Sequence, residues 1–482
     1  MADAYRMLIG GEWTASESGA TFDATSPATG EVIGSLPEGT REDARRALAT
    51  AADAWPGWAA MSAFDRAAAM RRIAAAVDER REDLARTLTL DQGKPFRAEA
   101  LDEVEELIAY FEMAAADATR LEGLIPPSMD AANRIFLYRV PRGVVGVISP
   151  WNWPYTMPGE IVAPALASGN AVVLAPAPTT SVCAVKLAEC VHAADLPPGV
   201  FNLVTGPGPV VGDEVASNRL TAAVGFIGSI ATGHAVASRA AAKELLLEMG
   251  GNGPLVVCDD ADLDAAVEAT LTACFLNAGQ SCTAGERILV QEPVHDAYLE
   301  KLTAAIGERI RLGDPFDDAT TMGPLNNAPV ADKTERHVTE ARDRGASVVA
   351  GGGRSSEHGS ELFFEATVLD GVTDDMEIAR EETFGPVVPV TAIRDEAEVI
   401  RLVDDAEYGL LSAIFTADLG RGLRFAERVR TGWVNVNEGT NYWESHLPFG
   451  GRAGSASGVG RVGGRFSMDR LTELKTIVVH VG

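Results

Sequence analysis

The chain has 482 residues, enough for about three domains, and its 46% hydrophobic and 23% charged residues are typical of a globular protein with a large core. A formal net charge of −28 repels nucleic acid and anionic lipid, so we expect neither a nucleic-acid nor a membrane partner. No apolar run reaches the ~18 residues of a membrane helix, and the N-terminus lacks the pattern of a secretory signal.

Strand-like and helical stretches alternate in the first half of the chain. Residues 40–122 are rich in Ala, Arg, Glu and Leu and predict helices. Short β-rich runs follow at 144–149, 171–176, 201–206, 223–228 and 254–260, and stretches with helical spacing lie between them at 179–195 and 233–244. This alternation predicts a parallel α/β sheet, which binds ligands at the carboxyl ends of its strands.

The second half repeats an α/β pattern. Residues 262–277 predict an amphipathic helix, because Leu263, Val267, Leu271 and Cys274 recur on one face. The pattern continues to about residue 435. The last sixteen residues end in an apolar strand, which we expect to pair with the chain's own sheet or with a neighbouring subunit.

Asn152 follows the first of these strands and lies between two tryptophans and two prolines. Such rigid surroundings would orient its amide in advance. An amide N–H aimed at a developing oxyanion can raise a rate by on the order of a hundredfold. The same string also fits a structural turn.

Two glycine-containing loops follow later strands. Residues 205–212, which include Gly208, fit either a dinucleotide loop or an ordinary turn. Residues 228–233 join a strand to a helix, where Gly228 and Ser229 would offer backbone N–H groups and a hydroxyl to a diphosphate. Two such loops on one sheet favour a dinucleotide site.

Glu248 ends an apolar run of three leucines and precedes two glycines. Burial at this position would raise the pKa of its carboxyl toward neutrality and make it a usable general base. A salt bridge is the alternative, and it would tie the carboxylate up.

Cys282 follows the helix at 262–277, and its neighbours are small enough to leave the thiol accessible. A thiolate is a strong nucleophile, whereas an inert buried cysteine is the alternative and our expectation for the other four. Five cysteines without C-x-x-C spacing fit a reducing cytoplasm. Because the seven histidines are scattered as well, we expect no metal site.

Together these segments resemble the aldehyde dehydrogenase superfamily over nearly the whole chain. The shared strings are, in order, LIGGEW, SPATGEVIG, DQGKP, PWNWP, GSIATG, LLLEMGGNGP, NAGQSCTAGER, EETFGPV, GWVNVN and LPFGG. Each string is short, but their common order makes the resemblance strong. It implies a non-acylating enzyme that oxidises an aldehyde to a carboxylic acid with NAD(P), through a thiohemiacetal and a thioester.

The resemblance also implies a role for each matching residue. Cys282 would attack the aldehyde, Asn152 and the Cys282 backbone N–H would hold the oxyanion, and Glu248 would activate the hydrolytic water. The implied cofactor contacts are Ser149, Trp151, Ala175, Gly208, Gly228, Ser229, Gly250, Glu382 and Phe384. The implied substrate pocket comprises Trp153, Met157, Ser281, Thr283, Tyr442, Trp443 and Phe449, although some of these rings could equally pack the core.

The family fold implies three parts. A Rossmann-like cofactor domain would take residues 1–118 and 142–250, and an α/β catalytic domain would take residues 251–450. A small β arm for oligomerisation would take residues 119–141 and 467–482. We therefore expect a cytoplasmic homodimer or homotetramer.

Three features depart from the family pattern. Ala175 stands where a lysine usually holds the adenine-ribose hydroxyls, and Pro178 stands where NAD-preferring members often have glutamate. Losing one charge-assisted hydrogen bond would weaken cofactor binding by about ten- to a hundredfold. We expect NAD, with NADP possible. The loop 452–461 is longer than usual and lacks a common lysine, and its Arg452 could meet an anionic substrate.

Two other functions stay open from the sequence. In a CoA-acylating relative, CoA would replace water as the acyl acceptor, but the presence of Glu248 argues against it. A catalytically silent member would serve binding or structure, but Cys282, Asn152 and Glu248 together argue against that.

Overall fold

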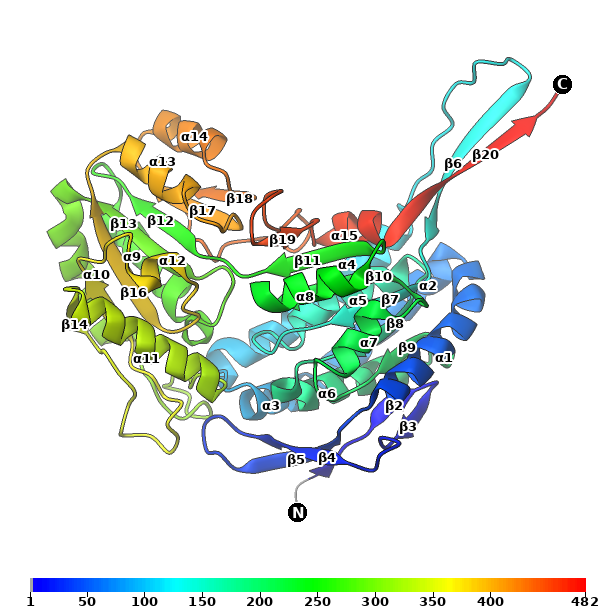
Figure 1. The fold of residues 1–482 in the computed structure, drawn as a ribbon, viewed down its shortest axis with the longest axis horizontal. Helices are drawn as coiled ribbons and strands as arrows, with labels where there is room; N and C mark the ends of the chain where they lie inside the picture. Colours follow the sequence, from blue (N-terminus) through cyan, green and yellow to red (C-terminus); the bar gives the residue numbers. More distant parts are fainter. Residues whose placement is uncertain (1–2) are drawn as a thin grey trace.

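Two large sheets organise the chain, of which the computed structural model describes residues 3–482 (Figure 1). The first sheet consists, in spatial order, of β19 (Gly458–Val459), β11 (Glu244–Met249), β10 (Thr221–Gly228), β7 (Val144–Ile148), β8 (Ala171–Ala175), β9 (Phe201–Leu203), β2 (Met7–Ile9) and β3 (Glu12–Thr14). Its five central strands run parallel, whereas β19, β2 and β3 pair antiparallel at the edges. The predicted parallel α/β sheet is confirmed.

The helices around this sheet come mainly from the first half of the chain. They are α1 (Arg41–Ala60), α2 (Ala63–Asp78), α3 (Arg81–Asp91), α4 (Leu101–Ala118), α5 (Thr156–Ala167), α6 (Ser181–Ala193), α7 (Val211–Ser217), α8 (Ile230–Ala240) and α15 (Gly464–Leu471), with a π-helical turn at Phe96–Ala100 before α4. A small sheet of β1 (Asp3–Ala4), β5 (Val32–Pro37) and β4 (Thr21–Thr25) lies at the N-terminus.

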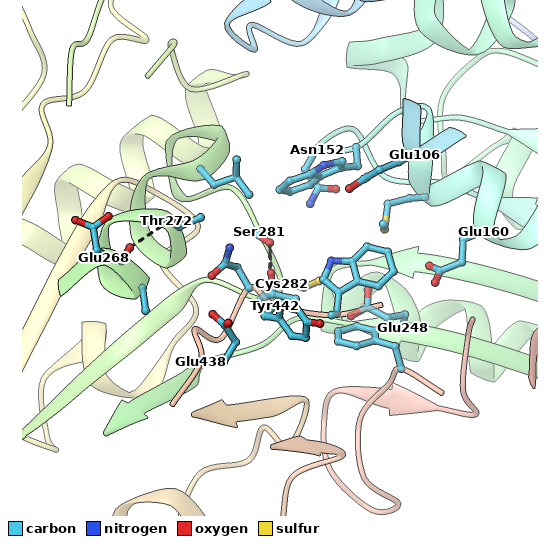
Figure 2. A pocket seen from close by; sticks show the side chains of 18 of the residues that line it. Glu106, Asn152, Glu160, Glu248, Glu268, Thr272, Ser281, Cys282, Glu438 and Tyr442 are labelled. Carbon is cyan, nitrogen blue, oxygen red and sulfur yellow. Dashed lines mark hydrogen bonds between the residues drawn. The ribbon is translucent and has the colours of Figure 1, made fainter. Parts of the chain in front are cut away.

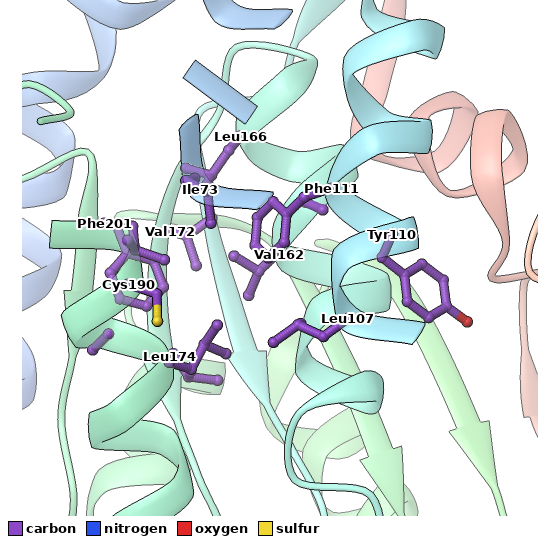
Figure 3. Close-up of a cluster of buried hydrophobic side chains, with 14 of the residues drawn as sticks. Ile73, Leu107, Tyr110, Phe111, Val162, Leu166, Val172, Leu174, Cys190 and Phe201 are labelled. Atoms are coloured by element: carbon purple, nitrogen blue, oxygen red, sulfur yellow. The ribbon is translucent and has the colours of Figure 1, made fainter. Parts of the chain in front are cut away.

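Alternating residues of the central strands pack on opposite faces of the sheet. In β8, Val172 and Leu174 point toward the cluster that α2, α4, α5 and α6 supply, and Figure 3 shows Phe111 and Val162 in that cluster. Val173, between them, belongs to a separate cluster with α1 and α7. Because side chains alternate along a strand, an all-apolar strand needs helices on both faces, and these helices bury it completely.

The second sheet carries the chain from residue 253 to residue 436. Its strands are, in spatial order, β14 (Ser347–Ala350), β15 (Thr367–Asp370), β16 (Val387–Ile393), β13 (Gly285–Gln291), β12 (Gly253–Val257), β17 (Leu411–Phe415) and β18 (Trp433–Val436). Its helices are α9 (Leu263–Phe275), α10 (His295–Arg309), α11 (Ala328–Asp343), α12 (Glu377–Arg380), α13 (Glu396–Asp404) and α14 (Leu419–Arg428). All neighbouring pairs except β14–β15 are parallel.

A two-stranded ribbon extends away from both sheets (Figure 1). Strand β6 (Asn133–Pro141) pairs antiparallel with the terminal strand β20 (Thr472–His480) over nine residue pairs. The expected terminal strand therefore pairs within its own chain. Helix α15, just before β20, packs Met468 and Leu471 into the first sheet's core. The predicted arm boundary at residue 467 thus falls inside a helix of the main body.

Two predicted elements differ from the structure. The helical stretch 233–244 ends at Ala240, because Glu244 already begins β11, a strand that the sequence analysis did not identify. The predicted strand 254–260 corresponds to β12 and belongs to the second sheet, not to the first. Within residues 3–482 no helix is long and apolar enough to cross a membrane.

Candidate active site

Cys282 lies in a tight loop between α9 and β13. Three consecutive residues before it, Asn277, Ala278 and Gly279, adopt positive φ angles of 52°, 53° and 73°. A non-glycine residue in this conformation costs roughly 1–3 kcal/mol, so the surroundings must hold the loop in place. Glu99 does so by accepting the Asn277 backbone N–H at 3.0 Å, and the side chain of Gln92 donates to Asn277 Oδ1 at 2.9 Å.

The other four cysteines are buried, as expected, whereas Cys282 is partly exposed. Burial raises the pKa of the Cys282 thiol well above its ordinary value, and the nearby charge of Glu248 raises it further. The thiol therefore needs a local proton acceptor to become a nucleophile at neutral pH.

Glu248 ends the run of leucines on β11, so it reaches Cys282 from the other sheet. It is 3% exposed, and its Oε1 has no hydrogen-bond partner in residues 3–482. Burial raises the pKa of this carboxyl well above its ordinary value, and Cys282 offsets part of the shift. No cation pairs with Glu248 in that part of the chain, so the salt-bridge alternative is not realised.

Asn152 is fixed over the same loop. Its Nδ2 donates to the Gln280 carbonyl at 3.1 Å, and its own carbonyl accepts from Asn277 Nδ2 at 2.9 Å. The residue is buried, and only one of its two amide hydrogens is used in this bond. The other hydrogen makes no hydrogen bond within residues 3–482.

A cavity of about 550 Å³ opens on one side of Cys282 (Figure 2). All the side chains predicted for the substrate pocket line it, namely Trp153, Met157, Ser281, Thr283, Tyr442, Trp443 and Phe449. The rings of Trp443 and Phe449 are neighbours in its wall, with their centres 5.9 Å apart. Arg452 is not among the lining residues.

Sequence reasoning missed the acidic residues of this cavity. Glu106, Glu160, Glu268 and Glu438 line it as well. Glu160 lies in α5, three residues after Met157, and its place inside a predicted helix next to the PWNWP string could have drawn attention to it. No motif marks Glu106, whose position depends on how α4 packs.

A second cavity, of about 180 Å³, also reaches Cys282. Six predicted cofactor residues line it: Trp151, Gly228, Ser229, Gly250, Glu382 and Phe384. Cys282, Glu248 and Asn152 line both cavities, so they stand at the junction between them.

The polar groups of the second cavity are firmly held. Glu382 Oε1 accepts the Gly251 N–H at 2.8 Å, and a Cβ atom on Gly250 would come within 2.8 Å of the same carboxylate. Burial, together with the charge of Glu286, raises the pKa of Glu382 to about 8. Phe384 has a φ of +62°, and its N–H donates to Glu286 at 2.9 Å.

Ser229 is the N-cap of α8, and its side chain accepts the Thr232 N–H at 3.4 Å. Helix N-termini carry unpaired N–H groups that favour an anionic ligand.

Three predicted cofactor residues, Ser149, Ala175 and Gly208, lie outside both cavities. Ser149 donates its N–H to the Ala175 carbonyl at 3.2 Å, and Gly208 is exposed in the loop before α7.

Comparison with known proteins places these features in a family. The family model described as the aldehyde dehydrogenase family matches residues 13–477. Glutarate-semialdehyde dehydrogenase of Pseudomonas putida is 39% identical over 475 residues, which cover 98% of this chain and 97% of the relative. The chain belongs to the aldehyde dehydrogenase family. The NADP-dependent succinate-semialdehyde dehydrogenase of Escherichia coli is also 39% identical, with 98% and 97% coverage.

Solved structures agree with this assignment. A crystal structure of an NADP-dependent enzyme of E. coli has a TM-score of 0.96 and 38% identity, and covers 99% of this chain and 98% of that one. An NAD-dependent aldehyde dehydrogenase of Sinorhizobium meliloti has a TM-score of 0.96 at 36% identity, with coverage of 100% and 96%. This aldehyde dehydrogenase is therefore an oxidoreductase that uses a nicotinamide cofactor, and its relatives include users of NAD and of NADP.

Proposed function

We propose that this aldehyde dehydrogenase oxidises its substrate through covalent catalysis by Cys282. Cys282, after losing its thiol proton, attacks the aldehyde carbon as a thiolate, and the carbonyl oxygen becomes an oxyanion in a thiohemiacetal. The free amide hydrogen of Asn152 and the Cys282 backbone N–H stabilise that oxyanion. The observation that carries the proposal is that Cys282, Asn152 and Glu248 line both cavities, where an aldehyde and a cofactor can approach one carbon from opposite sides.

The second cavity fits the reactive end of a nicotinamide cofactor, which when bound accepts the hydride that converts the thiohemiacetal into a thioester. Glu382 would accept hydrogen bonds from ribose hydroxyls, and Trp151 and Phe384, whose rings lie 5.4 Å apart, would flank the ring. Gly228, Ser229 and the N-terminus of α8 would hold the diphosphate.

Glu248 would then activate water against the thioester. A general base is most effective when its pKa lies near the working pH, and the burial of Glu248 moves its pKa in that direction. Water attack releases the carboxylic acid and returns the Cys282 thiol.

Glu248→Gln tests this order of steps. We expect the variant to release its first equivalent of reduced cofactor and then to turn over at least about a hundredfold more slowly, because deacylation lacks its base. Intact-protein mass spectrometry should show an acyl group on Cys282, and Cys282→Ser should show none. A Glu248→Gln variant that turns over at the normal rate without an acyl group would contradict the proposal.

Equal production of acyl-CoA and acid by the wild-type enzyme when CoA is added would favour CoA acylation.

For the cofactor, we propose NAD, with NADP accepted less well. Ala175 is buried at the end of β8 and offers no charge to an adenine ribose or to its 2′-phosphate. We expect kcat/KM to be at least about tenfold higher with NAD, and Ala175→Lys to lower the KM for the cofactor by gaining one charge-assisted hydrogen bond. Equal kcat/KM values for NAD and NADP would overturn the preference.

For assembly and location, the proposal is a cytoplasmic homodimer or homotetramer with no nucleic-acid or membrane partner. Residues 1–118 and 142–250 would form the cofactor domain and residues 251–450 the catalytic domain. Residues 119–141 and the terminal strand from Thr472 onward would form the subunit-pairing arm, because residues 467–471 belong to helix α15. The exposed apolar side chains of strand β20 support the role of the arm.

A further inference from the structure

The substrate-side cavity has an unusual balance of charge. Five glutamates line it, namely Glu106, Glu160, Glu248, Glu268 and Glu438, and no lysine or arginine does. Within residues 3–482 only Glu268 forms an ion pair, with Arg309. Lys94 lies behind the wall, 3.7 Å from the centre of the Trp153 ring, and is paired with Glu103 at 2.6 Å.

Glu160 is the most enclosed of these carboxylates apart from Glu248. It is 3% exposed, and one oxygen accepts a hydrogen bond from the Tyr110 hydroxyl at 3.2 Å. Its other oxygen has no hydrogen-bond or ionic partner in residues 3–482. Figure 2 shows Glu160 and Glu106 directing their carboxylates toward the cavity. A buried carboxylate without a cation is unfavourable unless a ligand supplies the charge.

Aromatic rings complete these surroundings. Trp153, Tyr442, Trp443 and Phe449 line the same cavity. The ring of Trp443 stacks on Tyr110, the hydrogen-bond partner of Glu160, with 6.4 Å between the ring centres. Aromatic faces attract ammonium groups, and most strongly where water is excluded. Carboxylates and ring faces together form a setting that favours a cation and repels an anion.

We infer that this cavity selects an aldehyde that carries a positively charged nitrogen, with Glu160 as its main anionic contact and Glu106 as a second. The inference rests on the proposed function and specifies its substrate class. A preference for a cation would distinguish this enzyme from the relatives that are named for glutarate and succinate semialdehydes. Those semialdehydes carry a carboxylate, which the unpaired glutamates of this cavity would repel. Within the cavity, the ammonium would lie between Glu160 and the aromatic wall while the aldehyde carbon reaches Cys282.

The proton affinity of these groups is consistent with a missing cation. Burial raises the pKa of Glu160 to about 8, and the charge of Glu106 adds to that rise. Burial and the charge of Glu103 raise the pKa of Glu106 to about 7, although the charge of Lys94 lowers it in part. A bound ammonium would favour the ionised form of both.

The test compares three aldehydes of similar length with the purified full-length enzyme and NAD. They are 4-(trimethylammonio)butanal, its uncharged isostere 5,5-dimethylhexanal, and 4-oxobutanoate. The charged group lies three carbons from the carbonyl in the first, so the intrinsic reactivity of the isosteric pair is similar. We expect kcat/KM for the cation to exceed that of the isostere at least about tenfold, as 1.4 kcal/mol of cation recognition would give, and the anion to be the poorest substrate.

Variants then assign the effect to residues. Glu160→Gln retains an acceptor for Tyr110 and should lower kcat/KM for the cation about tenfold, while the isostere changes less than about twofold. If Glu160→Gln fails to fold, Glu106→Gln, at a partly open position, takes its place. It should likewise lower kcat/KM for the cation more than for the isostere. Glu112→Gln, on an exposed part of the same helix, is the matched control and should change nothing.

The outcomes distinguish a wrong substrate class from a wrong proposed function. Turnover of 5,5-dimethylhexanal at least equal to that of the cation, or a preference for 4-oxobutanoate, overturns the substrate class and leaves the proposed function intact. Equal losses on all three aldehydes in Glu160→Gln show a structural role and overturn the contact. Failure of the wild-type enzyme on every aldehyde, with NAD and with NADP, overturns the proposed function itself.

Discussion

The interaction between Cys282 and Glu248 shifts their two pKa values in opposite directions: Glu248 raises the pKa of the thiol, whereas the hydrogen bond from Cys282 offsets part of the rise in the pKa of Glu248. The carboxylate raises the pKa of the thiol by repulsion, and the buried position of both groups disfavours either charge. Because the two groups are coupled, the ionisation of the Cys282 thiol depends on the charge state of Glu248.

This coupling can be measured by alkylation of Cys282 with iodoacetamide. The wild-type rate should rise with pH into the alkaline range, because the pKa of the thiol is raised and only the thiolate reacts. Glu248→Gln removes the repelling charge, so the profile should move to lower pH, with about tenfold faster labelling at neutral pH for each unit by which the pKa falls. Cys282→Ser reports labelling of the four buried cysteines. Slower labelling of Glu248→Gln at every pH would mean that Glu248 acts chiefly as the base for the thiol.

At the scale of elements, the short strand β19 fastens the edge of the first sheet beside the site. It pairs antiparallel with Leu247 and Glu248 of β11. Ser457, just before it, donates from its hydroxyl to the Gly250 carbonyl at 2.8 Å and accepts the Gly409 N–H at 3.1 Å. The long loop 452–461 therefore ties the turn that follows Glu248 and β11 to the segment just before β17 of the second sheet.

Ser457→Ala should loosen this connection. Two buried backbone groups lose their partner, which costs roughly 1–3 kcal/mol each, and the melting temperature should fall by a few degrees. The KM for the cofactor should also rise, because Gly250 lines the second cavity. Differential scanning calorimetry and steady-state kinetics measure the two effects, and Ser238→Ala, exposed on α8, is the matched control. An unchanged melting temperature would show that water replaces the hydroxyl.

Some elements could be predicted from the sequence and others could not. The PWNWP, GSIATG and NAGQSC strings predicted residues that do meet around Cys282, because each string fixes a turn at the end of a strand or helix. β11 was missed because its run LLLEM lies directly after a helical stretch and contains leucine, which has no strand preference. β19 has two residues and exists only through its pairing. Glu106 and Glu160 were missed because helix packing, not local sequence, decides which helical residues face a cavity.

On the scale of the whole molecule, the ribbon of β6 and β20 leaves apolar side chains in water. Leu474, Val478 and Val481 are each more than half exposed, and Ile477 and Val479 are about two-fifths exposed. A long apolar strand edge readily pairs with a second protein chain, so an isolated subunit with this ribbon would be prone to associate.

Two charges on the ribbon should prevent that association. We expect the double variant Leu474→Asp/Val478→Asp to elute as a monomer, because pairing would bury two unpaired carboxylates, while the wild type elutes as a dimer or tetramer. Light scattering coupled to size-exclusion chromatography gives the masses. Val349→Asp, an exposed valine on the edge of the other sheet, should leave the mass unchanged. A wild-type protein that is monomeric at micromolar concentration would contradict the role of the arm.

The nucleophile and the base come from different sheets: Cys282 precedes β13 of the second sheet, whereas Glu248 belongs to β11 of the first. Any hinge motion between the two halves of the subunit therefore changes the distance between these two side chains. The activity of the site would then depend on closure. A subunit that opened to release its products would also separate the Cys282 sulfur from the Glu248 carboxylate, and it would be inactive until the two halves closed again.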